Sequence, residues 1–352
     1  MTETKDWSEK WAVENWFLHG HRIMDTAPEG SNKTLLGLWL VICIATGTPF
    51  LGQQVKQGSV VIIDEETPYP SLTSHLSRFA LSVGCKDWRE LPITVKSMEG
   101  FRFGRKTELD KLLKLVYDIK PVMLRMDSVV AMLPGARKGL SENDSGIGVA
   151  IKDDLNKIKQ FVDIISISAH AKKAMCECSW KELKTKEMQS IVRGSGSIVG
   201  EGCDTGLVIR KISEYPLPSR FVISTRARRQ AVPLANKDIY VEIKEEAYGE
   251  GWMKLERISP VALPASSIAC VLFELFKEQS DKEWSQKQLR QEAAFYTLND
   301  LRDAITELKD RRVILNGKNS LNYHLNEKWE VEVSESYRKS LYPEKVQAGG
   351  VV

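Results

Sequence analysis

A short loop near the beginning of the chain carries residues that can bind phosphate. It lies between a short apolar stretch and a long apolar run, and it reads Ala27, Pro28, Glu29, Gly30, Ser31, Asn32, Lys33 and Thr34. A phosphate-binding loop requires backbone N–H groups at a helix N-terminus, a lysine that reaches the β- and γ-phosphates and a hydroxyl for Mg²⁺. Gly30, Lys33 and Thr34 supply these parts, so residues 27–34 are a candidate nucleotide site.

The loop departs from the pattern G-x-x-x-x-G-K-[ST] at both glycines, where it has Ala27 and Asn32. Glycine serves at these positions because the backbone can require a positive φ or a close approach to phosphate. Asparagine tolerates the left-handed conformation better than most residues. Taken alone, the loop fits a phosphate site and an ordinary helix cap equally well.

Polar residues also end three predicted strands. Glu65 and Glu66 end the strand at 59–66, Asp127 follows the apolar residues from 121, and His170 closes the strand at 162–170. Parallel α/β sheets bind ligands at the carboxyl ends of their strands. A carboxylate at that end of a strand adjacent to the phosphate loop can orient an attacking water. The plainer interpretations are a solvated acidic turn for Glu66 and a structural histidine for His170.

Arg125 interrupts the otherwise apolar strand that ends at Asp127. A buried arginine requires a partner, and Asp127 or an acid elsewhere in the chain could supply it. The alternative is an arginine without a partner when no nucleotide is bound. This residue, with Ala27 and Asn32, favours slow turnover.

The elements that position these residues alternate between helix and strand. Helical patterns cover 34–46, 71–84, 108–119 and 151–161, and strand patterns cover 59–66, 121–130 and 162–170. This alternation predicts an α/β fold with a parallel sheet. Two later strands, 206–212 and 219–226, are joined by a short Pro-containing turn and predict an antiparallel extension.

The chain divides into four predicted segments. Residues 1–20 carry Trp7, Trp11 and Trp16 at helical spacing and form an N-terminal packing segment. Residues 21–259 form the α/β domain. Three helices and a hairpin within 260–330 predict a winged helix-turn-helix domain, and 331–352, like 136–147, form a mobile segment.

Composition narrows the class of protein. The 352 residues include 50 basic and 47 acidic ones, so the net charge of +3 gives no general affinity for nucleic acid. No run approaches the roughly 18 apolar residues that cross a bilayer, and the start lacks a signal peptide. We expect a cytoplasmic protein without a membrane partner, whose six scattered cysteines stay reduced.

From Thr34 to Leu76 the sequence resembles the RepA-like hexameric replicative helicases, P-loop ATPases of the RecA and DnaB superfamily with an AAA-type domain. The likeness lies in the G-x-P-F-L-G turn at 47–52 and in Leu72 and Leu76, which stand seven and eleven positions into a segment that begins at Glu66. It extends in order over about residues 23–258. It implies a RecA-like P-loop NTPase core with a central, mostly parallel sheet and a small C-terminal winged helix.

The resemblance also implies roles for these residues. The loop at 27–34 holds ATP, Thr34 and Asp127 hold Mg²⁺, and Glu66, or Glu65 beside it, polarises the attacking water. His170, followed by Ala-Lys-Lys, is similar to the family's γ-phosphate sensor. Arg226 and Arg228 match a segment that reaches the γ-phosphate of a neighbouring subunit, and their plainer interpretation is a solvated turn or a DNA contact.

A regional excess of positive charge lies between 171 and 230, with twelve basic and six acidic residues. In the resembled fold this region faces a central channel, where single-stranded DNA would contact basic side chains and stack on Trp180. The candidates are Lys172, Lys173, Lys184, Lys186 and Arg193. The alternative is a solvated loop. Cys176, Cys178 and His170 lack the second ligand pair of a zinc site.

These observations favour an ATP-dependent helicase that works as a hexameric ring on single-stranded DNA, in replication of a plasmid, virus or other mobile element. The winged helix, with nine basic and nine acidic residues from 260 to 326, fits a replication or regulatory protein partner as well as DNA. The alternative is a weakly hydrolysing, nucleotide-dependent switch, a regulator or loader that assembles on DNA or on a partner protein.

Overall fold

The computed structural model describes most of the chain in two compact units. The described residues are 10–28, 30–133, 145–172, 186–192, 203–213, 219–227, 232–247, 249–258, 267–292, 298–317, 322–328 and 332–333. Those up to 257 belong to the first unit and those from 258 on to the second. The segments expected to be mobile, 136–147 and 331–352, lie largely outside the described residues.

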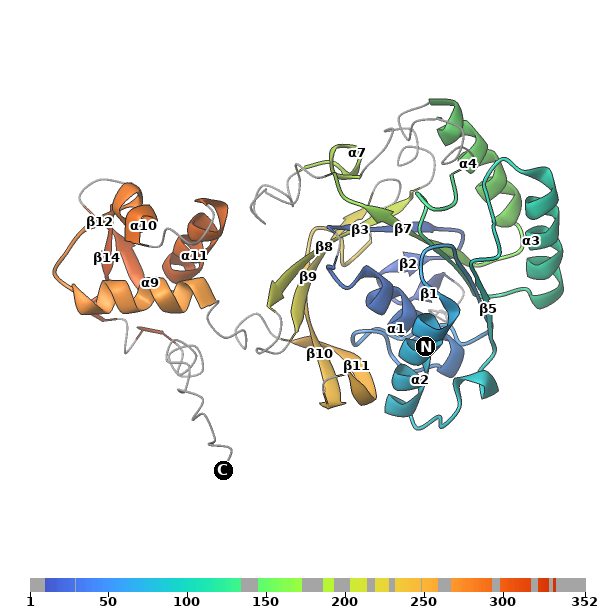
Figure 1. Cartoon of the computed structure of the whole chain (residues 1–352), viewed down its shortest axis with the longest axis horizontal. Helices are drawn as coiled ribbons and strands as arrows, with labels where there is room; N and C mark the ends of the chain where they lie inside the picture. Colours follow the sequence, from blue (N-terminus) through green and yellow to red (C-terminus); the bar gives the residue numbers. More distant parts are fainter. Residues whose placement is uncertain are drawn as a thin grey trace, which may run out of the picture. The chain divides into compact units, whose positions relative to one another are not determined.

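A nine-stranded sheet forms the centre of the first unit (Figure 1). Its order is β11-β10-β9-β8-β3-β7-β6-β4-β5. The strands are β3 (Arg22–Ala27), β4 (Val60–Asp64), β5 (Ile93–Ser97), β6 (Met123–Asp127), β7 (Ile164–His170), β8 (Thr205–Ser213), β9 (Arg220–Ala227), β10 (Asp238–Ala247) and β11 (Glu250–Ile258).

The six strands from β8 to β5 run parallel to their neighbours, and β9 and β10 extend the sheet in antiparallel order. The mostly parallel α/β sheet and its antiparallel extension are therefore confirmed. One expectation is wrong: β4, which leads to Glu66, is not adjacent to β3, because the crossovers insert β6 and β7 between them. Glu66 must reach the phosphate loop across two strands.

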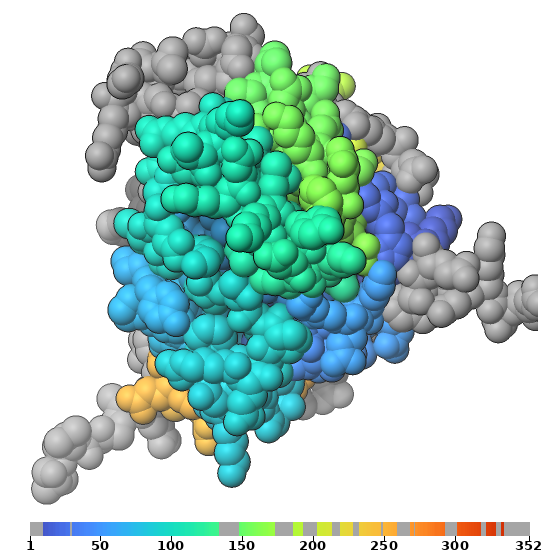
Figure 2. Space-filling model, turned by 90° about the vertical axis from the view of Figure 1, so that its right-hand side faces the viewer, coloured from blue at the N-terminus to red at the C-terminus, as the bar shows by residue number. Residues whose placement is uncertain are grey.

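Four helices cover the two faces of the sheet. Helices α1 (Lys33–Thr46) and α2 (Tyr69–Ser82) pack on one face, and α3 (Lys106–Ile119) and α4 (Ser145–Ile158) pack together on the other (Figure 1). Figure 2 shows the second face, where the green atoms of α4 lie beside the teal atoms of the region around α3. Helix α1 is buried from Leu36 to Ala45, as its apolar composition requires.

The N-terminal residues form two short strands rather than the expected helix. Strands β1 (Trp11–Val13) and β2 (Phe17–Leu18) pair antiparallel through a turn in which Asn15 has a φ of 60°. The backbone of this segment bonds to the loop after α1, with Glu14 N donating to Gln54 O (2.9 Å). These bonds to another segment replace the i to i−4 bonds that a helix would make, and Trp16 is completely buried.

The second unit contains three helices and a small antiparallel sheet. The helices are α9 (Ser267–Glu278), α10 (Gln286–Glu292) and α11 (Leu298–Asp310), and the strands β12 (Trp284–Ser285), β13 (Ile314–Asn316) and β14 (Asn322–Leu325) pair in the order β12-β14-β13. Phe273, Phe276 and Trp284 are buried at its core. Among the described helices of either unit, none has both the length and the apolar character that crossing a membrane requires.

Candidate nucleotide site

The loop between β3 and α1 has the backbone shape that phosphate binding requires. Gly30 and Asn32 both have left-handed backbones, with φ of 72° and 65°. Asparagine thus adopts, in place of glycine, the conformation that the sequence predicts for it. Glu29 lies outside the described residues. Helix α1 begins directly after Asn32, with no capping side chain and no acidic residue in its first turn. Its N-terminal N–H groups and the positive end of its dipole therefore favour binding of an anion.

Lys33, the first residue of α1, folds back over its own loop. Its Nζ donates to the carbonyl oxygens of Ala27 (3.1 Å) and Pro28 (3.2 Å). The side chain is buried, and burial lowers the pKa of Lys33, although the nearby carboxylates of Asp25 and Asp127 oppose this shift. A phosphate in the loop would therefore replace two carbonyl contacts with a charge-assisted contact to the same amine.

Thr34 and Asp127 are in contact at the carboxyl end of β6. Thr34 Oγ1 donates to Asp127 Oδ2 across 3.2 Å, which brings the first turn of α1 to the carboxyl end of β6. Hydroxyl and carboxylate oxygens are ligands suited to Mg²⁺. The two residues that the sequence predicts for the metal are thus brought into contact.

Arg125 fills the space beneath these residues with a network of charged side chains. Its guanidinium bonds Asp25 on β3 through both terminal nitrogens and also donates to Ser166 Oγ (2.8 Å) and to Asp127 Oδ2 (3.2 Å). Both possible partners that the sequence leaves open, Asp127 and a distant acid, are therefore used. Burial alone would lower the pKa of Arg125, but the two carboxylates raise it, so the guanidinium remains charged.

The water-polarising candidate, Glu66, meets the sensor candidate, His170. His170 Nε2 lies 3.3 Å from Glu66 Oε2. This hydrogen bond lowers the pKa of Glu66 to about 2, although partial burial acts in the opposite direction. Glu66 is therefore a carboxylate at neutral pH and remains accessible to solvent, with 45% of its side chain exposed.

Glu65 is used differently from its neighbour. Its carboxylate accepts from the backbone N–H groups of Gly100 (2.9 Å) and Phe101 (3.0 Å) and from Arg102 Nη1 (3.1 Å). The loop after β5 thus holds this buried carboxylate with three donors. Between the two acidic candidates, the contacts favour Glu66 for chemistry.

Asp64, the last residue of β4, shapes the turn that carries both glutamates. Its Oδ1 accepts from the backbone N–H groups of Glu66 (2.9 Å) and Thr67 (2.6 Å). Burial and the charge of Asp127 raise the pKa of Asp64 to about 6. Asp64 was not among the predicted site residues. Its position at the end of an apolar strand, two residues before the candidate Glu66, could have indicated a role in the site.

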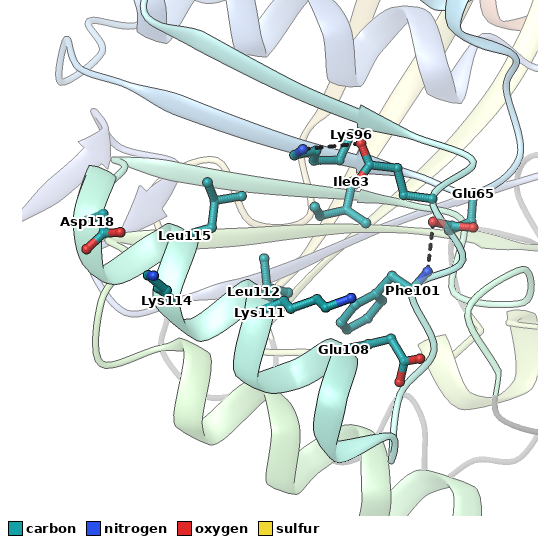
Figure 3. Close-up of a pocket in the computed structure, with 11 residues that line it drawn as sticks. Ile63, Glu65, Lys96, Phe101, Glu108, Lys111, Leu112, Lys114, Leu115 and Asp118 are labelled. Carbon is teal, nitrogen blue, oxygen red and sulfur yellow. Dashed lines mark hydrogen bonds and ion pairs between the residues drawn. The ribbon is translucent and has the colours of Figure 1, made fainter.

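A cavity of about 410 Å³ opens between β4, β5 and α3, on the other side of Glu65 (Figure 3). Ile63, Phe101, Leu112 and Leu115 provide its apolar wall, and Lys96 and Glu99 form an ion pair at its rim (3.2 Å). The hydrogen bond from Phe101 to Glu65 closes one end (Figure 3). No residue of the phosphate loop lines this cavity, so it is separate from the nucleotide site.

The candidate DNA-binding and intersubunit residues are only partly described. Lys172 donates to the carbonyl of Gln189 (3.1 Å), Lys186 is half-buried, and Arg226 on β9 donates to Ser224 Oγ. The remaining candidates, together with the cysteines near His170, lie outside the described residues: Lys173, Cys176, Cys178, Trp180, Lys184, Arg193 and Arg228. Their roles stay predictions.

The residues present fit ATP and Mg²⁺. In the described part of the chain no cluster of three His, Cys, Asp or Glu side chains could hold a metal alone. Magnesium at nucleotide sites is usually held by one or two protein oxygens together with phosphate oxygens, and Thr34 and Asp127 match that pattern beside the loop. Arg125 opposes this fit, because it occupies the same Asp127 oxygen.

Comparison with known families agrees with this geometry. Residues 3–174 match the family model of an AAA domain. The matched segment contains the phosphate loop, Glu66, Asp127 and His170, and it ends before β8. This part of the chain is thus a P-loop NTPase-like domain of RecA type. No curated protein matches the chain significantly.

Proposed function

We propose that this protein is an ATP-dependent motor that works on single-stranded DNA, a helicase of the RepA-like kind. The observation that supports ATP hydrolysis is that three features meet at the carboxyl ends of the central strands: the phosphate loop with Lys33, the Thr34–Asp127 contact, and the Glu66 carboxylate. Such a constellation catalyses phosphoryl transfer by positioning and charge neutralisation.

Each residue has a distinct task in this proposal. The N–H groups of the loop and of α1 bind the phosphates, and Lys33 turns from its carbonyl partners to them. Thr34 and Asp127 would hold Mg²⁺, which would neutralise the negative charge that develops on the phosphates. Glu66 accepts a hydrogen bond from the attacking water, and its contact with His170 orients the carboxylate.

The DNA-binding and ring-forming parts depend on the resemblance and on the basic residues between 171 and 230. Lys172 and Lys186 flank the segment proposed to face the DNA, and Arg226 with Arg228 would complete a neighbour's site. In the second unit, three helices and an antiparallel sheet support a winged helix, whose partner would be DNA or a replication or regulatory protein.

A second candidate function is a slowly hydrolysing switch that loads or regulates another protein. Two observations favour it: Arg125 occupies the Asp127 oxygen intended for the metal, and Asn32 replaces glycine in the loop. The ATPase rate with and without single-stranded DNA, followed by a strand-displacement assay, separates the two. DNA-stimulated hydrolysis with unwinding supports the motor, whereas slow hydrolysis that DNA leaves unchanged, without unwinding, supports the switch.

A further inference from the structure

The charged network around Arg125 crosses the sheet beneath the phosphate loop. Arg125 lies on β6 and Asp25 on β3, and β7 runs between these two strands. The guanidinium therefore spans β7, where Ser166, its register partner, also bonds it. All three charged side chains, Arg125, Asp25 and Asp127, are nearly inaccessible to solvent.

Helix α1 is shaped to admit this guanidinium. A Cβ atom added to Gly37 would lie 2.5 Å from Arg125 Cζ and 2.8 Å from Nη2, which is closer than atoms can approach. A side-chain end can usually move aside, but this one is held by Asp25, Ser166 and Asp127 at once. The glycine, the arginine and the aspartate on β3 thus form one packed unit.

The guanidinium and the Thr34 hydroxyl share one acceptor atom. Arg125 Nη2 and Thr34 Oγ1 each lie 3.2 Å from Asp127 Oδ2. Two donors occupy the lone pairs of that oxygen, and a fixed positive charge lies beside it. A divalent cation that binds this oxygen of Asp127 must therefore weaken one of these two hydrogen bonds and lie close to the positively charged Arg125.

We propose that Arg125 is a built-in counter-cation of Asp127, which holds this carboxylate in position before nucleotide arrives and weakens the binding of Mg²⁺ to the site. The inference depends on the proposed function, because Mg²⁺ would enter with the nucleotide. Arg125 acts through Asp127 and is a positioning residue.

The first test compares the wild type with the double variant Asp25→Leu, Arg125→Met. Removing both members of a buried ion pair in favour of apolar side chains is often tolerated, whereas removing one is not. A fluorescent ATP analogue is titrated at a series of Mg²⁺ concentrations. The Mg²⁺ concentration for half-maximal binding should fall by about tenfold in the double variant, a change of about 1.4 kcal/mol. Arg125→Lys, which keeps a cation, should stay within about threefold of the wild type.

The second test needs no nucleotide. Gly37→Ala should lower the Tm of the wild type, because the new Cβ displaces a held guanidinium. In the double variant the same change should leave the Tm unchanged or raise it, because alanine favours a helix over glycine. Equal effects in the two backgrounds would overturn the packed unit and with it the inference.

The two proposals fail in different ways. If the wild type binds no nucleotide at any Mg²⁺ concentration, the proposed function is overturned and this inference with it. If the wild type binds nucleotide and the double variant has the same Mg²⁺ midpoint, only the inference is overturned. A lower midpoint in the double variant, together with the Gly37 result that depends on background, supports it.

Discussion

Glu66 follows β4 and His170 ends β7, and although these strands are not neighbours, the two side chains meet. Strand β6 lies between β4 and β7, and His170 Nε2 reaches Glu66 Oε2 across 3.3 Å above its end. The contact links the carboxylate proposed to orient water with the strand that lies beside β3.

Replacing Glu66 by glutamine should separate binding from chemistry. Glu66→Gln should keep ATP affinity within a few-fold of the wild type and lose hydrolysis by about 10²–10⁴-fold, because a neutral amide accepts no proton from water. The matched variant is Glu65→Gln, which should lower the stability of the fold by about 1–3 kcal/mol, because its partners are buried backbone N–H groups. Normal turnover in Glu66→Gln would remove the assignment.

Lys33→Ala should weaken ATP binding by at least about tenfold, or about 1.4 kcal/mol. The amine is the buried cation of the loop, and alanine offers the phosphates nothing in its place. Equilibrium binding of a fluorescent nucleotide measures the effect, with the exposed Lys86→Ala as the control. Equal affinities for the two variants would show that the loop does not hold phosphate.

Asp64 should make stability depend on pH in the acid range. Its pKa is about 6 in the folded protein against an ordinary value of 3.8, so the folded state binds this proton more tightly. The resulting stability is fully present below about pH 4 and is lost as the pH rises to about 6, by an amount on the order of 3 kcal/mol. Urea unfolding at pH 4 to 7 should show a smaller loss for Asp64→Asn, which retains an acceptor oxygen. Parallel pH curves for the two proteins would contradict this.

Lysines of the basic region should contribute to DNA binding through phosphate contacts. Replacing Lys172, Lys173, Lys184 and Lys186 by alanine should weaken binding to single-stranded DNA and reduce the log–log salt slope by about 0.7 for each lost contact. Anisotropy titrations at several salt concentrations give both quantities. Deletion of 260–352 should have a smaller effect, and a truncation that alone abolished binding would place the DNA site in the second unit.

If Arg226 and Arg228 complete a neighbour's site, activity should depend on assembly. The rate of hydrolysis per subunit should rise with protein concentration. Mixed Arg228→Ala and Lys33→Ala subunits should recover activity, because one retains the phosphate loop and the other the arginine. Mixtures shown to co-assemble without any recovery would exclude a role in trans.

Local sequence patterns predicted the elements that are buried on all sides. The mostly apolar runs at α1, β4, β6 and β7 predicted buried elements, since a polar group there requires a partner. Strands β5, β10 and β11 were missed, and β3 was recognised only as a short apolar stretch. Burial alternates along much of β10 and β11, and their charged residues conceal the strand pattern, while β5 is a short edge strand that is half-buried throughout.

The sequence predicted individual residues of the site but not which of them contact one another. The phosphate loop, Asp127 and Glu66 follow from residue type, spacing and resemblance. The pairing of Arg125 with Asp25 depends on β7 lying between their strands, which no local pattern reports. The opposite charges in two apolar strands were the available signal. Only the strand order shows that they meet.

The central place of β3 has a consequence for the order of events on the ribosome. Residues 22–27 leave the exit tunnel early, but their neighbours in the sheet, β7 and β8, follow only when residues 164–213 have been made. The indole N–H of Trp16 gains its hydrogen-bond acceptor later still, when Thr225 has been made. Until then a strand with two open edges lies in a growing chain, which is a common starting point for misassociation.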